Sequence, residues 1–259
     1  MLLLALDTST RQSSIALCTE DELLGEYVWN AGTNHSVELL GHLQRLLTEN
    51  QLTMQQIDAV AVATGPGSFN GVRVSLSTAK ALAFALKKPL LGVSTLDSIA
   101  AQQRQWRAPV CAILEAGRGE LYAASYLFDE ISDPGGYVTY RMHQLSDYLL
   151  LPPQRLSAYL LEHANEWVGV PGERSLPPFL FCGEISAASR QALLGSMHEN
   201  CLFVPGLQSA RRSSVLASLA FQRLDKGEED NPLLLEPLYL RRPSITTSTR
   251  KRALLGGIK

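Results

Sequence analysis

A glycine-rich junction at residues 64–74 constrains the fold of this chain more than any other stretch, because it joins a strand-like run to a helix-like run. The residues before it, IDAVAVA at 57–63, are mostly small or β-branched, which is typical of a strand buried on both faces of a parallel sheet. The residues after it, 72–86, have a helical composition. Pro66 and the three glycines of TGPGSFNGVRV end the strand, since glycine adopts backbone angles that other residues resist. The junction therefore predicts an α/β unit.

Two roles for this junction stay open on the sequence alone. Amide hydrogens at the start of a helix can bind an anion, and the same residues can instead form a tight structural turn. A P-loop ends in Gly-Lys-Ser/Thr and a dinucleotide site reads G-x-G-x-x-G, whereas here G-x-G-x-x-x-G is followed by Val-Arg. The candidate anion- or nucleotide-binding residues of this loop are Gly65, Gly67, Ser68, Gly71 and Arg73.

The hydrophobic pattern of the whole chain predicts an antiparallel start followed by alternating helices and parallel-type strands with right-handed crossovers. We expect strands near 2–7, 13–19, 22–30, 57–63, 90–93, 110–115 and 120–128, and a lone strand near 179–182. We expect helices near 34–50, 72–86, 95–104, 186–194 and 213–224, the first with Thr33 or Asn34 as its N-cap. A region rich in Pro, Gly and Ser, 129–178, receives no helix or strand.

Composition is that of a compact globular chain. Its 259 residues suffice for one large or two small domains. The 23 basic and 25 acidic residues create no global field that would attract nucleic acid, so any such contact would be local or supplied by a partner. The four cysteines stand far apart, as small core residues do. The apolar start MLLLAL is short and runs into Asp7, which predicts a first strand, no membrane contact and a cytoplasmic protein.

Residues 65–83, GPGSFNGVRVSLSTAKALA, resemble the signature of the bacterial TsaB family, also called YeaZ. Further family-like segments follow in the same order. They are LALDTST at 4–10, NHS at 34–36, PLLGVSTLDSIA at 89–100, RGELY at 118–122 and PLYLR at 237–241. The resemblance is dense over residues 1–125, thin from there to about 230, and returns near 240. Where the family usually reads DARRGE, this chain has EAGRGE at 115–120, which weakens any role for Glu115.

The resemblance implies an α/β, actin-like (RNase H-like) fold, of the kind found in sugar kinases and Hsp70 ATPases, with two small lobes of mixed sheets flanked by helices. We expect an N-terminal lobe at 1–105, with a helix at about 211–225 packing back on it. A second, smaller and degenerate lobe is expected at 106–210. Residues 240–259 are expected to be a basic, flexible tail that could add phosphate contacts to tRNA.

Asp7, Thr8 and Ser9 occupy the first strand-turn, where the actin-like superfamily places a phosphate-binding loop. The carboxylate could orient a metal-bound water, and the hydroxyls could hold phosphate. The alternative is an ordinary polar turn, since Ser9 replaces the usual glycine and keeps a phosphate away from the backbone. Gly183 is the nearest candidate for a second phosphate loop.

Metal and nucleophile sites are not expected in this chain. The segment of the catalytic relative TsaD that corresponds to residues 89–99 resembles P-L-x-x-V-N-H-x-E-x-H, whose two histidines bind a metal. Thr95 and Ile99 stand at those two positions here, and neither replaces an imidazole. The five histidines do not rebuild such a site elsewhere, and no G-x-S-x-G elbow is present. We expect no intrinsic cofactor, with ATP and metal used by partner subunits.

The helices predicted at 35–49 and 72–86 carry apolar residues over wide arcs, more than one sheet face would cover. Core packing accounts for at least half of these residues. We expect the rest to form an exposed edge that docks the equivalent helices of a partner. The residues predicted for this edge are Leu39, His42, Leu46, Ser77 and Lys80.

The resemblance implies a non-catalytic scaffold or activating subunit in the synthesis of N6-threonylcarbamoyladenosine in tRNA. TsaD would be its direct catalytic partner, TsaE would bind at the TsaB–TsaD junction, and a TsaC-type enzyme would supply threonylcarbamoyl-adenylate. The tRNA would be bound through the complex, and a homodimer through the same helices stays open. The competing class is an enzyme, either an actin-like small-molecule kinase or a glycoprotease-like metalloenzyme.

Overall fold

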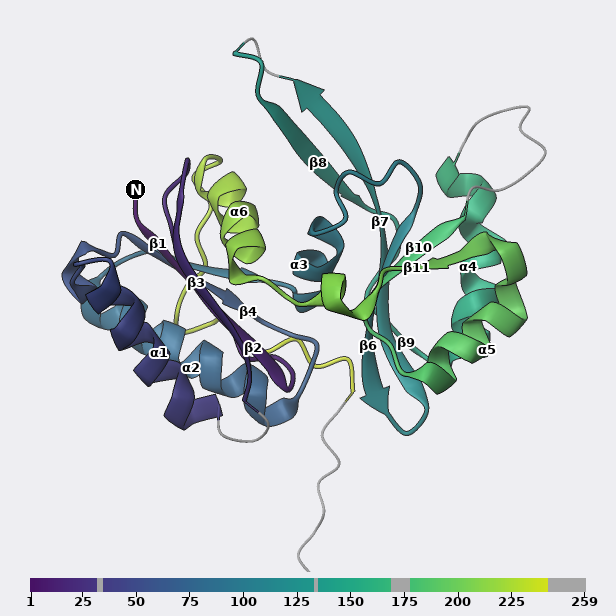
Figure 1. The fold of residues 1–259 in the computed structure, drawn as a ribbon, viewed down its shortest axis with the longest axis horizontal. Helices are drawn as coiled ribbons and strands as arrows, with labels where there is room; N and C mark the ends of the chain where they lie inside the picture. The colour runs from purple at the N-terminus through teal and green to yellow at the C-terminus, as the bar shows by residue number, and fades with distance from the viewer. Residues whose placement is uncertain (32–34, 133–134, 169–177, 242–259) are drawn as a thin grey trace, which may run out of the picture.

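The computed structural model describes residues 1–31, 35–132, 135–168 and 178–241. Two mixed sheets stand side by side, each with helices on both of its faces (Figure 1). The expected fold class, α/β with two lobes of mixed sheets flanked by helices, is confirmed. No helix among the described residues is both long and apolar enough to cross a membrane.

The first sheet has the strand order β3-β2-β1-β4-β5. Its strands are β1 (Leu3–Asp7), β2 (Gln12–Cys18), β3 (Leu23–Asn30), β4 (Ala59–Ala63) and β5 (Leu90–Val93). The first three strands form an antiparallel meander, and β4 and β5 run parallel to β1. Every residue of β1 and β4 is buried, as the apolar runs at these positions predict. The carboxyl ends of β1, β4 and β5 therefore meet at one edge of the sheet.

Helices cover both faces of the first sheet. On one face lie α1 (His35–Glu49) and α2 (Phe69–Leu86), and on the other lies α6 (Ser213–Leu224). A short 3-10 turn, Met54–Gln56, leads into β4. Helix α2 begins three residues earlier than its composition predicts, because the Ser68 side chain caps it by accepting a hydrogen bond from the Gly71 amide at 3.3 Å. The N-cap predicted at Thr33 or Asn34 for α1 lies outside the described residues.

The second sheet has the order β11-β10-β6-β7-β8, with β9 paired to β7. Its strands are β6 (Val110–Gly117), β7 (Glu120–Ser132), β8 (Val138–Gln144), β9 (Leu149–Leu151), β10 (Phe179–Glu184) and β11 (Cys201–Phe203). Helices α4 (Pro153–Val168) and α5 (Ala187–Met197) pack on one face, and α3 (Thr95–Ala101) packs on the other. Short 3-10 turns lie at His198–Asn200 and Gly206–Ser209.

Two secondary-structure predictions are wrong in the second lobe. The strand near 179–182 is not alone, because β10 pairs in parallel with both β6 and β11. The region 129–178 contains β8, β9 and α4. Its turn-forming residues concentrate in the links between these elements, and the half-exposed strand β8 lacks the apolar run that marks a buried strand.

A C-terminal strap, residues 229–241, follows α6 and crosses the first lobe toward the second. The Asp230 amide donates to the Leu90 carbonyl and the Leu238 amide donates to the Thr64 carbonyl, both at 2.8 Å. At the end of the strap, an Arg241 guanidinium nitrogen donates to the carbonyl of Ala116 at 2.9 Å, in the second lobe. The strap therefore joins the edge of the first sheet to the β6–β7 hairpin. The expected tail beyond residue 241 lies outside the described residues.

Candidate functional site

The turn after β1 and the glycine-rich junction after β4 meet at the carboxyl edge of the first sheet. The Thr8 hydroxyl donates to the Gly71 carbonyl at 2.6 Å and accepts from the Ser75 amide at 3.1 Å. The Ser68 amide donates to the Ser9 carbonyl at 2.6 Å. Thr8 and Ser9 are completely buried. Two loops that are about 60 residues apart in the sequence are thus held together by the Thr8 hydroxyl and by a backbone hydrogen bond.

Glycine is required in the junction because the two backbones approach so closely. A Cβ atom on Gly67 would lie 2.2 Å from the Ser9 carbonyl oxygen, and one on Gly71 would lie 2.1 Å from that of Thr8. Gly65 has φ +100, a conformation that favours glycine. Arg73 lies over the ring of Phe69 and donates to the hydroxyl of Tyr239. These contacts support the structural role of the junction, while anion binding by its glycines stays a prediction.

A buried arginine fills the space beside the turn after β1. Arg211, which precedes α6, donates from Nε to Asp7 Oδ2 at 2.8 Å, and its side chain is 1% exposed. Its other guanidinium nitrogens donate to Glu184 at the end of β10 and to the Gln12 carbonyl. The Thr10 hydroxyl donates to the same Glu184 carboxylate at 2.5 Å. Arg211 therefore links the first strand of one lobe to a central strand of the other.

The Arg211 guanidinium and the carboxylates of Asp7 and Glu184 attract one another. Burial alone would lower the pKa of the Arg211 guanidinium, but the carboxylates of Asp7 and Glu184 outweigh it and raise that pKa above its ordinary value. The second oxygen of Asp7 accepts from the Ser9 amide at 2.8 Å and from the Ser9 hydroxyl at 2.5 Å. Both carboxylate oxygens of Asp7 are consequently occupied by protein donors.

Gly183, the candidate for a second phosphate loop, lies in β10 with φ +105. A Cβ atom there would stand 2.1 Å from the Ile113 carbonyl oxygen of the neighbouring strand β6. The glycine is required for this close approach within the sheet. Its neighbour Glu184 uses its carboxylate for Arg211 and Thr10.

Helix α3 holds Thr95 and Ile99, the two positions at which the family resemblance was used to look for metal-binding histidines. Ser94 caps the helix by accepting from the Leu96 amide, and Thr95 is buried with no hydrogen-bond partner for its hydroxyl among the described residues. Ile99 packs in the core of the second lobe with Val110. Among the described residues, no three His, Cys, Asp or Glu side chains are grouped as metal ligands.

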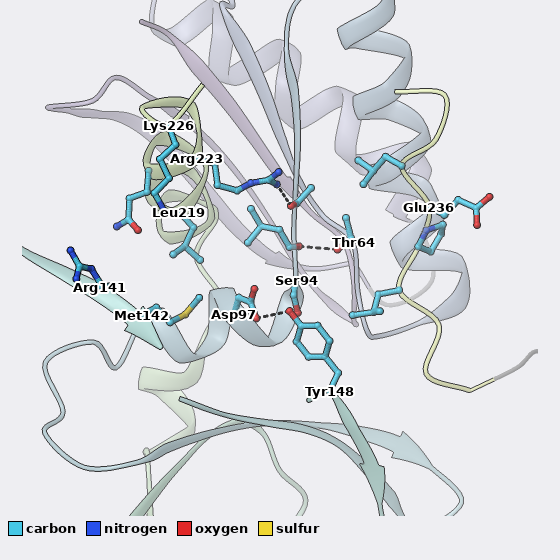
Figure 2. Close-up of a pocket in the computed structure, with 16 residues that line it drawn as sticks. Thr64, Ser94, Asp97, Arg141, Met142, Tyr148, Leu219, Arg223, Lys226 and Glu236 are labelled. Atoms are coloured by element: carbon cyan, nitrogen blue, oxygen red, sulfur yellow. Dashed lines mark hydrogen bonds between the residues drawn. The ribbon is translucent and has the colours of Figure 1, made fainter. Parts of the chain in front are cut away.

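A cavity of about 580 Å³ lies beside α3 and is lined by residues of α3, β8, α6 and the strap (Figure 2). Asp97 lies at its edge, where one carboxylate oxygen accepts from the hydroxyls of Tyr126 at 2.7 Å and Tyr148 at 2.9 Å. Burial raises the pKa of Asp97 above its ordinary value, although the hydrogen bonds from Tyr126, Tyr148 and Ser94 oppose that rise. Asp97 thereby fastens α3 to the second sheet.

The structure corrects part of the predicted docking edge. Leu39 is 0% exposed and Leu46 is 2% exposed, so both belong to the core of the first lobe and cannot contact a partner. They face the sheet together with Leu43. The prediction failed because apolar residues surround much of α1, and the sequence does not say which side of the helix faces the sheet.

The other predicted edge residues lie closer to the surface. His42 is half-buried and packs its ring against Trp29, with ring centroids 4.3 Å apart. Ser77 is exposed and Lys80 is half-buried on α2. Three large apolar side chains of these two helices that the sequence did not single out are more than half exposed: Val37 at 78%, Leu40 at 56% and Phe84 at 76%.

Comparison with known proteins identifies the family. A family model described as "TsaD: tRNA N6-adenosine threonylcarbamoyltransferase" matches residues 29–247. The chain is similar to the tRNA threonylcarbamoyladenosine biosynthesis protein TsaB of Bacillus subtilis, with 37% identity over 128 residues that cover 49% of this chain and 56% of that protein. It is also similar to the protein of the same name from Escherichia coli, with 33% identity over 184 residues that cover 66% of this chain and 71% of that protein. The chain belongs to the TsaB family.

Solved structures agree with membership of the TsaB family. The structure of YeaZ from Pseudomonas aeruginosa superposes with a TM-score of 0.69 at 28% identity, covering 92% of this chain and 99% of that one. The likeness therefore includes the second lobe, where the sequence resemblance was thin.

Sequence reasoning did not find the Arg211 cluster in this TsaB-family chain. Arg211 and Asp7 are 204 residues apart, so no local spacing relates them. The available signal was a pair of arginines directly before an apolar helix, followed by two serines. Such a basic pair reads as an ordinary solvated helix start until the fold brings Asp7 and Glu184 to it.

Proposed function

We propose that this chain is a non-catalytic subunit of the machinery that makes N6-threonylcarbamoyladenosine in tRNA. It acts as a scaffold that pairs with a catalytic TsaD-type subunit and activates it. The relatives named TsaB are tRNA threonylcarbamoyladenosine biosynthesis proteins, and the same family model describes the transferase TsaD. This proposal assigns assembly, and not bond-making, to the present chain.

The buried Arg211 carries the non-catalytic part of the proposal. In an actin-like enzyme, the turn after the first strand holds phosphate, and its carboxylate orients a metal-bound water. In this chain a guanidinium lies against Asp7 and Glu184, and the remaining Asp7 oxygen is taken by Ser9. A divalent cation or a phosphate would have to displace a fully buried, doubly paired arginine, which costs several kcal/mol, about 3–5 for breaking such a pair.

The scaffold part rests on the outer face of α1 and α2, which we call the docking face and define as Val37, Leu40, Ser77, Lys80 and Phe84. Helices α1 and α2 lie beside one another on the side of the first lobe that faces away from the second lobe (Figure 1). Three of the five side chains are large, apolar and more than half exposed. Two adjacent helices with exposed apolar side chains suit helix packing with a partner. The same face would serve a homodimer of the isolated chain.

The remaining members of the system follow from the family. We propose that TsaE binds at the junction with the TsaD-type subunit, that a TsaC-type enzyme supplies threonylcarbamoyl-adenylate, and that ATP and metal are used by these partners. The tRNA would be engaged through the complex in the cytoplasm. The present chain contributes the helices of the docking face and no cofactor of its own.

Reconstitution tests the proposal. The purified chain is mixed with TsaC-, TsaD- and TsaE-type proteins of the same cell and unmodified tRNA, each protein is omitted in turn, and threonylcarbamoyladenosine is measured by mass spectrometry. We expect product only when this chain and the TsaD-type protein are both present. Equal modification without the chain would refute the scaffold role.

The enzyme alternatives make opposite predictions in the same samples. A small-molecule kinase would, without partners, hydrolyse ATP or transfer a phosphoryl group from it. A glycoprotease-like enzyme would cleave peptide without partners. We expect neither from the wild-type chain. The matched control is Leu207→Glu, which changes a side chain that is 97% exposed and lies off the docking face, and it should support full modification.

A further inference from the structure

An exposed cluster of aromatic rings and an arginine lies at the start of α2. The Arg73 guanidinium carbon is 3.7 Å from the centre of the Phe69 ring, and its Nε donates to the Tyr239 hydroxyl at 2.7 Å. The Phe69 and Tyr239 rings stack with centroids 5.5 Å apart and planes inclined by 30°. Phe69 remains 43% exposed and Tyr239 remains 38% exposed. Two large rings are thus held in a fixed orientation at the surface.

The second lobe brings further cations to this cluster. Arg241, two residues after Tyr239, donates to the Ala116 and Gly117 carbonyls of the β6–β7 hairpin, and its charge is paired with Glu120. At the tip of that hairpin stands Arg118, exposed and with φ +58. No hydrogen bond or ion pair of the Arg118 side chain is found in the described part of the chain. We call Phe69, Arg73, Arg118, Tyr239 and Arg241 the aromatic patch.

The local charge around the aromatic patch is positive, although the whole chain carries a net charge of −2. Arg73 has a ring and a hydroxyl as its partners and no carboxylate, and Glu120 is already neutralised by Arg241. Glu236, which is exposed on the strap, is the nearest acidic residue in sequence on that segment. Residues 242–259, which lie outside the described part, continue from this point with five Lys or Arg residues and no Asp or Glu.

Stacked aromatic faces combined with arginines suit the bases and phosphates of unpaired RNA. A base stacks on any aromatic face regardless of its identity, and arginine adds both a planar stacking partner and a phosphate contact. A surface that docks a protein would be expected to be mainly apolar, whereas here each ring lies next to an arginine. The patch adjoins the docking face on α2, since Arg73 and Ser77 are one helical turn apart, whereas Phe84 lies 15 residues from Phe69, about 22 Å at 1.5 Å per residue.

We propose that the aromatic patch binds unpaired nucleotides of an RNA, with a base stacking on Tyr239 and Phe69 and a phosphate contacting Arg118. The choice of tRNA as this RNA rests on the proposed function. Because the strap joins the two lobes, the patch includes residues of both. The RNA would therefore contact this subunit at the tip of the β6–β7 hairpin.

The experiment measures the affinity of the full chain for an unmodified tRNA transcript and for a fully paired RNA duplex of equal length, at several salt concentrations. We expect the wild-type chain to bind tRNA more tightly than the duplex, because the duplex offers no unpaired base. Tyr239→Ala should weaken tRNA binding about tenfold and leave duplex binding unchanged. Tyr239→Phe keeps the ring and should stay within about twofold of wild type.

A charge variant gives an independent reading. Arg118→Glu should weaken tRNA binding and reduce the slope of log affinity against log salt by about 1. The matched controls are Arg155→Glu, another exposed arginine on α4, and Tyr137→Ala, another exposed tyrosine. Both controls should bind tRNA as wild type does. Equal tRNA affinity for Tyr239→Ala and Tyr137→Ala would overturn the proposal, as would an absence of tRNA binding by the wild-type chain at low salt.

Failure of the proposed function is distinguishable from failure of the patch. If modification proceeds without this chain while Tyr239→Ala still loses tRNA affinity, the scaffold role is wrong and the RNA surface stands. If modification requires the chain and the patch variants keep wild-type tRNA affinity, the RNA surface is wrong. Loss of binding to the TsaD-type partner by Tyr239→Ala, with unchanged tRNA binding, would make the patch a protein contact and also overturn the proposal.

Discussion

Arg211 Nε donates to Asp7 Oδ2 at 2.8 Å, and the two side chains are only 1% and 2% exposed. The pair joins the segment before α6 to the end of the first strand, and the same guanidinium reaches Glu184 at the end of β10 in the second lobe. A single cation thus pairs with two carboxylates and ties together both sheets.

Removal of the buried cation should be strongly destabilising. In Arg211→Ala, Asp7 and Glu184 would be left in the cleft without their common partner, and breaking a buried pair in this way lowers the free energy of unfolding by about 3–5 kcal/mol. Arg211→Lys keeps one charge but lacks the fork that reaches Asp7, Glu184 and the Gln12 carbonyl together, so an intermediate loss is expected. Urea unfolding monitored by circular dichroism measures both.

The control for this prediction is a surface pair. Arg45→Ala removes the partner of Glu49 on α1, where the side chains are 68% and 47% exposed, and should cost about 0.5 kcal/mol or less. If Arg211→Ala cost no more than Arg45→Ala, the cluster would not be holding the lobes together.

The junction glycines predict a pair of opposite effects. Gly71→Ala places a methyl group against the Thr8 carbonyl oxygen, a backbone atom that cannot move aside, and should destabilise the fold by about 2–3 kcal/mol or more. Gly41→Ala, in the exposed part of α1 where no atom lies within 4 Å of the new methyl, should stabilise it by about 0.5–1 kcal/mol. Thermal or urea unfolding of the two variants checks both signs, and a harmless Gly71→Ala would contradict the close-approach argument.

Features set by local sequence pattern could be predicted, whereas features set by contacts between distant segments could not. The apolar run at 57–63 and the helix at 213–224 were predictable because local pattern sets them, and α6 has the predicted bounds. Helix α4 was not predicted, although Leu156, Leu160 and Ala164 stand at helical spacing after Pro153. The turn-forming residues on either side of it hide this spacing. The burial of Leu39 and the Arg211–Asp7 pair depend on which surfaces meet in the fold, which no spacing within a segment reports.

Asp97 predicts a pH dependence with a definite sign. Its pKa is raised above the ordinary 3.8 chiefly by burial, so between 3.8 and the raised value the folded chain binds more protons than the unfolded one. The stability contributed by this group is complete below pH 3.8 and is lost as the pH rises through that window. Asp97→Asn keeps an oxygen to accept from Tyr126 and Tyr148 without the charge, so its free energy of unfolding should gain on wild type as pH rises from 4 to 7.

Asp58 supplies a control of opposite sign. Its pKa is lowered by hydrogen bonds from the Leu2 amide and from Lys88, so its stabilising effect is lost as the pH falls through the lowered value. Wild type should therefore gain on Asp58→Asn as the pH rises from the lowered value to 3.8, and the two curves should run parallel above that, from pH 4 to 7. Urea unfolding at each pH gives the two differences, and parallel curves for Asp97→Asn and wild type would show that Asp97 does not titrate differently in the folded chain.

The docking face predicts loss of partner binding without loss of folding. Leu40→Glu combined with Phe84→Glu puts two carboxylates on side chains that are 56% and 76% exposed, so the melting temperature should stay within a few degrees of wild type. Burying these charges in a helix interface without partners should weaken affinity for the TsaD-type subunit at least tenfold, as measured by calorimetric titration. Any homodimer of the isolated chain should dissociate to the same extent in analytical ultracentrifugation.

Two comparisons decide whether this loss belongs to the docking face. Leu207→Glu combined with Leu233→Glu changes two leucines that are 97% and 82% exposed on other elements, and it should bind the TsaD-type subunit as wild type does. Leu39→Asp combined with Leu46→Asp, by contrast, charges the core of the first lobe and should unfold it, so its failure to bind would say nothing about docking. Wild-type affinity in a folded Leu40→Glu, Phe84→Glu variant would move the partner surface away from α1 and α2, since a tight helix interface cannot retain two unpaired charges at its centre.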